Sequence, residues 1–205
     1  VDPAVLQRCL AEAVEPSFNA ITIDGDTSTN DACVLMATGG SGVVVDSADS
    51  ATGRALFAAV HGVCMALARA IVKDGEGATK LVEIRVEEAA DRDEARAVAY
   101  TIAHSPLVKT ALFASDPNWG RILAAVGRAG LRDLDIRGVR IWLDDVRIVS
   151  GGGRDSGYTE AAGKAVVAQP EFAIRVALGR GATATRVLTC DLSFDYVKIN
   201  AEYRT

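Results

Sequence analysis

The sequence has few of the features that mark secreted, zinc-binding or membrane proteins. Its four cysteines, Cys9, Cys33, Cys64 and Cys190, are scattered without a CxxC pair, and three of them lie within apolar runs. This pattern favours buried free thiols in a reducing compartment and argues against a zinc site. No apolar run approaches the length of a membrane span, and residues 1–10 do not form a signal peptide. We therefore expect a soluble, cytoplasmic protein with no metal and no membrane contact.

A basic surface is missing as well. The formal net charge is −5 and the isoelectric point is near 5.1, whereas nucleic-acid surfaces usually show basic clustering. We expect no nucleic-acid partner. The 205 residues are 49% hydrophobic and 24% charged, an ordinary globular balance that suits one large or two small domains.

Hydrophobic periodicity predicts a mixture of helices and strands. Helices are expected at residues 3–15, 51–72, 91–103, 118–127 and 159–168. Strands are expected at residues 18–23 and 80–88, in a hairpin over 135–149, and over 172–178 with a turn at 179–181 and a return through Cys190. Ser105-Pro106 is expected to break the chain. A soft boundary near residues 86–91 separates an N-terminal lobe from an α+β C-terminal lobe.

The long helix at 51–72 is expected to bury one stripe of apolar residues. These residues recur at helical spacing: Leu56, Val60, Val63, Leu67 and Ile71. His61 lies in the same helix. A single histidine on such a helix is more often structural than catalytic, so we assign it no role.

The polar loop at residues 24–31 separates the strand expected at 18–23 from an apolar run at 32–37, which we expect to be a buried strand or buried helix segment. Its carboxylates, hydroxyls and carboxamide can satisfy the loop's own backbone groups. Asp24, Asp26 and Ser28 alternate as at the start of a calcium-binding EF-hand loop. Thr29 stands where that loop needs glycine and Leu35 where it needs glutamate, so a calcium loop is rejected.

A second candidate loop carries Glu76 between Gly75 and Gly77, just after the long helix. Glycines allow another group to approach the backbone closely. From the residues alone, a helix end with an exposed acid is the slightly better explanation of this loop. Lys80 is left without a role, and Trp119 is interpreted as a core anchor at a helix start.

Several stretches together resemble one family. They are DGDTSTND at 24–31, DGEGATK at 74–80, SPLVKTA at 105–111, SDPNWGR at 115–121 and the closing YVKINAEYRT at 196–205. These motifs are similar to those of the ornithine acetyltransferases, the glutamate N-acetyltransferases of the arginine pathway. The match runs from about Phe18 to Thr205, and its motifs are long and ungapped.

The resemblance implies an α/β fold of the mixed α+β kind. Residues 1–88 would complete a layered αββα-type catalytic domain together with a first fragment of the same precursor. Residues 89–205 would form a smaller α+β C-terminal domain whose tail returns to the active site. The family's precursor cleaves itself, and the new N-terminal threonine of the second fragment is the nucleophile. That threonine would lie upstream of Val1, so no catalytic residue is assigned within this chain.

The resemblance also implies the reaction and its partners. Acetyl would pass from N2-acetylornithine to glutamate through an acetyl-threonine intermediate, and some members also accept acetyl-CoA. No cofactor is implied. The first fragment would be an obligatory partner, with two αβ pairs forming a heterotetramer.

Three residues match substrate-binding positions of the family: Glu76, Asn200 and Thr205. Glu76 would bind the amino group of the amino-acid substrate. Chain ends normally fray, so the tail would have to dock through an apolar and aromatic anchor made of Tyr196, Val197, Ile199 and Tyr203. No role is assigned to Arg121.

Two other functions stay open. One is a related enzyme with an N-terminal nucleophile, either an aminopeptidase or an ornithine acetyltransferase of a secondary pathway. The other is a fragment that binds substrate without turnover.

Overall fold

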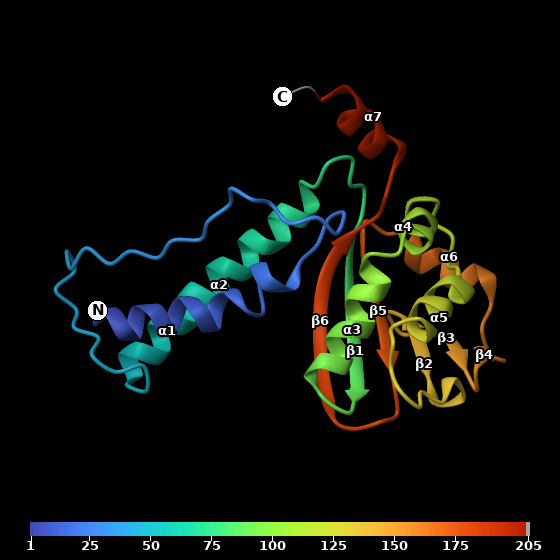
Figure 1. Ribbon diagram of the computed structural model, residues 1–205, viewed down its shortest axis with the longest axis horizontal. Coiled ribbons are helices and arrows are strands. Elements are labelled where there is room, and N and C mark those ends of the chain that lie inside the picture. The colour runs from blue at the N-terminus through green and yellow to red at the C-terminus, as the bar shows by residue number, and fades with distance from the viewer. Residues whose placement is uncertain (204–205) are drawn as a thin grey trace. The chain divides into compact units, whose positions relative to one another are not determined.

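The computed structural model describes residues 1–203 and divides the chain into two compact units (Figure 1). Unit 1 comprises Val1–Ile21 and Asp26–Ile71, and unit 2 comprises Thr22–Gly25 and Val72–Thr205. Helices and one mixed sheet are both present, which confirms the predicted α/β class. The expected boundary at residue 88 lies inside a strand of unit 2. The assignment of 1–88 and 89–205 to two domains of a larger enzyme stays a prediction.

Unit 1 begins with helix α1 (Pro3–Val14), as predicted. The Asp2 side chain caps it by accepting from the amide of Ala4 at 2.8 Å. The strand expected at 18–23 is wrong, because a short 3-10 helix, η1 (Phe18–Ala20), occupies its first half. The Ser17 hydroxyl donates to the Ala13 carbonyl at 2.6 Å, and the Ala20 amide donates to the Ser17 carbonyl. These bonds continue the helical turn instead of extending the chain.

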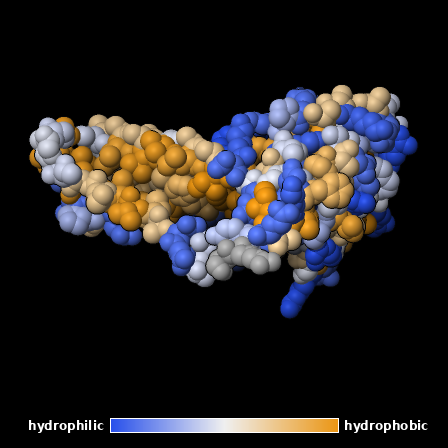
Figure 2. Space-filling view, turned by 90° about the horizontal axis from the view of Figure 1, so that it is seen from above, coloured by the Kyte–Doolittle hydropathy of each residue, from blue (hydrophilic) through white to orange (hydrophobic). Residues whose placement is uncertain are grey.

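The apolar run at 32–37 forms neither of the two structures expected of it. Residues 31–39 have no regular secondary structure, and the side chains of Val34 and Met36 are 72% and 81% exposed. An apolar segment becomes a buried strand only if a neighbour covers it, and no described segment of unit 1 does so. Figure 2 shows hydrophobic residues gathered on the surface of unit 1.

Helix α2 (Ala51–Lys73) forms where predicted, but its buried face differs from the predicted one. In its middle the buried residues are the small Cys64 and Ala68, with Val72 buried near its end, whereas Val63 and Leu67 are 59% and 51% exposed. Burial raises the pKa of the Cys64 thiol, and burial followed by the nearby Cys64 raises that of Cys9 in α1. Cys64 thus lies toward α1, while Val63 and Leu67 of the predicted stripe are left uncovered within the described part of unit 1.

By length and composition alone, α2 could cross a membrane: an 18-residue stretch of it has a mean hydropathy of 1.9, and 17% of that stretch is buried. The expectation that no apolar run approaches that length needs this correction. Arg54, His61 and Arg69 interrupt the run, but the alanines and large aliphatics between them keep its mean hydropathy high. A single helix of this length and composition is weak evidence for a membrane span.

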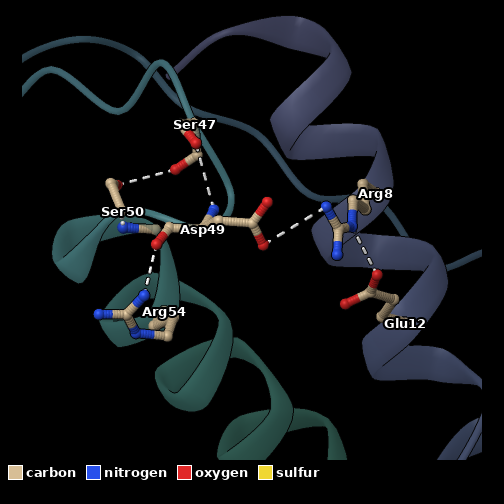
Figure 3. Close-up of polar contacts among 7 residues, drawn as sticks. Arg8, Glu12, Ser47, Asp49, Ser50 and Arg54 are labelled. Carbon is tan, nitrogen blue, oxygen red and sulfur yellow. Dashed lines mark hydrogen bonds and ion pairs between the residues drawn. The ribbon is translucent and has the colours of Figure 1, made fainter.

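Polar contacts tie the start of α2 to α1 (Figure 3). Arg8 pairs with Glu12 at 2.6 Å and lies 3.8 Å from Asp49. The Ser50 hydroxyl accepts from the Gly53 amide at 2.9 Å, while Arg54 donates to the Asp49 carbonyl. The charged groups in this cluster contact one another, so we interpret it as structural.

Unit 2 is built on a six-stranded mixed sheet with the order β4-β3-β2-β5-β1-β6. The strands are β1 (Leu81–Ala89), β2 (Arg140–Leu143), β3 (Val146–Ser150), β4 (Gly153–Arg154), β5 (Glu171–Ala177) and β6 (Thr183–Cys190). The alternation predicted for β1 is confirmed, with Val82, Ile84 and Val86 fully buried. The predicted hairpin is confirmed as β2 and β3, with Asp144 at a positive φ of 47° in its turn.

The strand predicted before the turn at 179–181 and the return predicted after it are both present, as β5 and β6, but the two strands do not pair with each other. Strand β1 lies between them, parallel to β5 and antiparallel to β6. The loop from β5 to β6 crosses the end of β1, where the amides of Arg180 and Gly181 donate to the Glu88 carbonyl at 2.8 and 3.0 Å. A Cβ at Gly181 would lie 2.5 Å from the Ala89 carbonyl oxygen, so the crossing requires glycine.

Five helices complete unit 2: α3 (Arg92–Ala103), α4 (Pro106–Phe113), α5 (Trp119–Gly127), α6 (Glu160–Val167) and α7 (Phe194–Glu202), besides the short η2 (Ile136–Gly138). Helices α3 and α6 form where they were predicted, and the side chains of Asp91 and Thr159 cap them. Helix α4 was not predicted, because Ser105-Pro106 was interpreted only as a break in the chain. It also begins a helix. The Ser105 hydroxyl accepts from the Val108 amide, and Pro106 occupies the first turn.

Candidate functional site

Two of the three predicted substrate-binding residues meet in unit 2. The Asn200 side-chain amide donates to the Glu76 carboxylate, with 2.6 Å between Nδ2 and Oε2. The two residues are 124 positions apart, and both are exposed. Thr205 lies outside the described residues.

A buried carboxylate holds the turn that carries Glu76 in place. Asp191, which is 3% exposed, accepts from the Thr79 amide at 2.8 Å, the Thr79 hydroxyl at 2.6 Å and the Lys80 amide at 2.9 Å. Three donors to one carboxylate fix the backbone just after Glu76. Sequence reasoning missed Asp191, because its partners lie 111 and 112 positions earlier.

Helix α7 touches the same turn directly. The Ser193 hydroxyl accepts from the Tyr196 amide at 3.3 Å and donates to the Gly77 carbonyl at 2.6 Å. Gly77 has φ +66°, and a Cβ there would lie 2.5 Å from the Tyr196 amide nitrogen. The glycine that follows Glu76 therefore allows the helix that carries Asn200 to approach this closely.

The first residue of the DGDTSTND motif also reaches α7. The Tyr196 hydroxyl donates to Asp24 Oδ2 at 2.9 Å. The site thus joins three segments: the turn at 74–80, the start of the polar loop and the C-terminal helix. The motif comparison indicated all three segments, but no local pattern pairs Asp24 with Tyr196.

The predicted way of docking the tail is wrong for this chain. No residue of α7 is buried, and Val197, Ile199 and Tyr203 are 62%, 40% and 72% exposed. Of the four expected anchors only Tyr196 is half-buried, and it makes hydrogen bonds through its amide and its hydroxyl. Hydrogen bonds of Ser193, Tyr196 and Asn200 hold α7, together with one edge-to-face contact of Phe194 with Phe113.

Two basic residues lie near the start of the polar loop, the exposed His104 and the buried Lys109. His104 Nε2 lies 3.1 Å from the Thr22 hydroxyl, and the His104 ring lies beside Gly25. Burial, followed by the charge of Lys109, lowers the pKa of His104. Lys109 is 3% exposed and donates to the Thr189 hydroxyl at 3.2 Å and to the Cys190 carbonyl, and burial lowers its pKa.

The remaining polar residues of the motifs have structural contacts. The Lys80 ammonium donates to the Ser115 hydroxyl at 2.6 Å and to the Val167 carbonyl, and burial lowers its pKa. Arg121 donates to the Leu107 carbonyl at 2.8 Å and so links α5 to α4. Trp119 packs against the core as expected. Among residues 1–203, no three His, Cys, Asp or Glu side chains are placed to hold a metal ion.

Comparisons with known proteins agree with this arrangement. The chain is 63% identical over 205 residues to the arginine biosynthesis bifunctional protein ArgJ of Methylococcus capsulatus, matching all of this chain and 50% of that protein. It is 55% identical over 202 residues to the protein of the same name from Pseudomonas fluorescens, matching 98% of this chain and 50% of that protein. The chain therefore spans about half the length of the curated relatives it matches.

A solved structure shows the same fold. The crystal structure of arginine biosynthesis bifunctional protein ArgJ from Bacillus halodurans matches with a TM-score of 0.92 and 37% identity, covering 99% of this chain and 95% of that one. The ArgJ family model matches residues 1–205. The chain belongs to the ArgJ family.

Proposed function

We propose that this chain is the second fragment of an acetyltransferase that moves acetyl from N2-acetylornithine to glutamate in arginine biosynthesis. The observation that carries the proposal is the contact of Asn200 with Glu76 at 2.6 Å. A carboxylate beside a carboxamide suits an amino acid, because the carboxylate accepts from an ammonium group and the amide donates to a carboxylate. The family membership and the names of the relatives support this choice of substrate.

The reaction needs a nucleophile, which we place outside this chain, on a threonine upstream of Val1. That threonine would take the acetyl group from acetylornithine, release ornithine, and pass the acetyl group to the amino group of glutamate. Glu76 would bind and orient the amino-acid substrate. The same proposal has three further points: acetyl-CoA serves as a second acetyl donor, no cofactor is needed, and the enzyme is cytoplasmic.

Unit 1 supports the need for a partner fragment. It leaves large apolar side chains uncovered on α2 and in residues 32–37, with Val63, Leu67, Val34 and Met36 more than half exposed. Exposed apolar patches commonly mark interaction sites. Because the curated relatives are about twice as long as this chain, we propose that the other half of the precursor covers these residues. We also propose that two pairs, each made of this chain and the other half of its precursor, associate into a heterotetramer.

The test is acetyl transfer by the full-length precursor with Glu76→Gln. The substitution removes the charge from a charge-assisted hydrogen bond, so we expect kcat/KM to fall by about 10- to 100-fold, or about 1.5–3 kcal/mol. Glu202→Gln removes an acid that is exposed two residues beyond Asn200 and should leave the rate unchanged. An unchanged kcat/KM in folded Glu76→Gln would contradict the assignment. Peptide hydrolysis in place of transfer would indicate the aminopeptidase, and binding without turnover would indicate a binding fragment.

A further inference from the structure

We propose that Asp24 and Tyr196 are positioning residues whose hydrogen bond holds α7, and with it Asn200, over Glu76. This inference rests on the proposed function and gives a role to the first residue of the DGDTSTND motif. Neither residue needs to touch substrate, because both act through Asn200.

The first step concerns how weakly α7 is otherwise held. The helix buries none of its residues. Phe194 is 82% exposed and makes one aromatic contact, edge-to-face with Phe113, with 5.7 Å between the ring centroids. Polar bonds therefore contribute most of what fixes the helix, and each bond removed loosens it.

The second step concerns the rigidity of Asp24. Its turn is fixed on the sheet side by the Thr22 amide, which donates to the Leu188 carbonyl at 2.9 Å. The Thr22 hydroxyl lies 3.1 Å from His104 Nε2. Gly25 follows with φ +103°, a conformation that β-carbon-bearing residues rarely adopt. Asp24 is thus a fixed acceptor rather than part of a loose loop.

The third step links Tyr196 to Asn200 along the helix. Residues four apart lie on the same face of a helix, one turn from each other. The Asn200 side-chain amide donates both to the Tyr196 carbonyl at 3.0 Å and to the Glu76 carboxylate at 2.6 Å. Any rotation of α7 that moves Tyr196 away from Asp24 therefore also moves the Asn200 amide away from Glu76.

Four variants of the full-length precursor separate positioning from other roles. Tyr196→Phe and Asp24→Ala each remove the bond, whereas Asp24→Asn keeps an acceptor oxygen for the tyrosine hydroxyl. Tyr203→Phe makes the same chemical change on an exposed tyrosine that follows the same helix.

We expect the first two variants to raise KM for the amino-acid substrates about threefold to tenfold, the loss of one hydrogen bond, with kcat within about twofold of wild type. Their double variant should add little to either single change. Asp24→Asn and Tyr203→Phe should keep wild-type KM. Hydrogen exchange of the backbone amides of residues 196–202 should quicken in Tyr196→Phe and Asp24→Ala alone.

Each alternative result is decisive. Wild-type KM and wild-type exchange in Tyr196→Phe would overturn the inference. Loss of activity in Asp24→Asn equal to that in Asp24→Ala would overturn it too, because the charge and not the hydrogen bond would then matter. If the wild-type enzyme transfers no acetyl, the proposed function fails, while hydrogen exchange still decides whether Asp24 holds α7.

Discussion

Gly77→Ala should disable the enzyme while leaving most of the fold intact. A Cβ at this position would lie 2.5 Å from the Tyr196 amide nitrogen and 2.7 Å from the Ser193 hydroxyl. Non-bonded heavy atoms settle at about 3.5–4.0 Å, so the start of α7 would have to retreat by about 1 Å. The Ser193–Gly77 and Asn200–Glu76 bonds, each 2.6 Å, would then stretch to about 3.6 Å, beyond hydrogen-bond range.

The expected cost in stability is smaller than the cost in activity. A non-glycine residue at the positive φ of Gly77 costs about 1–2 kcal/mol, and α7 has no buried residue whose burial is lost. For 205 residues this corresponds to a fall of about 2–8 °C in the melting temperature, and in the longer precursor the fall should be smaller. Because Asn200 no longer reaches Glu76, kcat/KM should fall by at least about tenfold.

The assay is steady-state acetyl transfer together with thermal unfolding, both on the full-length precursor. Gly127→Ala is the matched control, since a Cβ there meets no atom within 4 Å. Its melting temperature should be unchanged or slightly raised. A folded Gly77→Ala enzyme with normal kcat/KM would refute the reasoning, because α7 would then not need to approach Gly77 so closely.

Two further predictions concern pH and the partner fragment. His104 has a folded pKa below the ordinary 6.5, so the unfolded chain takes up its proton first as the pH falls, and the free energy of unfolding should drop below pH 6.5. Urea unfolding at pH 5 and 7.5 should show a smaller drop in His104→Gln, and equal drops would exclude this histidine as a source. Leu67→Glu places a charge on an exposed residue of α2 and should change the stability of the chain by less than about 0.5 kcal/mol. It should nevertheless abolish copurification with the other half of the precursor, and full copurification would show that α2 is not in that interface.

Local sequence patterns predict where the helices and strands of this chain lie better than they predict which faces of them are buried. The caps at Asp2, Asp91 and Thr159 depend on one side chain and the next three amides, so a local pattern is enough to find them. The buried face of α2 depends on what covers it. Apolar periodicity selected Val63 and Leu67, whereas burial falls on Cys64 and Ala68.

The candidate site shows the same difference between local patterns and long-range contacts. Glu76 and Asn200 could be predicted from motifs, and the structure brings them together. The contacts that hold them could not be predicted, because Asp24 meets Tyr196 across 172 positions of sequence. The tail was expected to dock by burying aromatic and aliphatic side chains. Nothing in its composition distinguishes that arrangement from the hydrogen-bonded one found.

The position of β1 has a consequence for synthesis of the chain. Leu81 pairs with Glu171, 90 positions later, and with Cys190 on the other side. While the ribosome makes the residues between, Val82, Ile84 and Val86 have no strand on either side of them. Unpaired apolar strands are prone to aggregate, and long-range pairing folds slowly. Strand β1, which lies between β5 and β6, therefore has to wait for residues 171–190 before it can pair, and this nascent segment is where we expect a chaperone to bind.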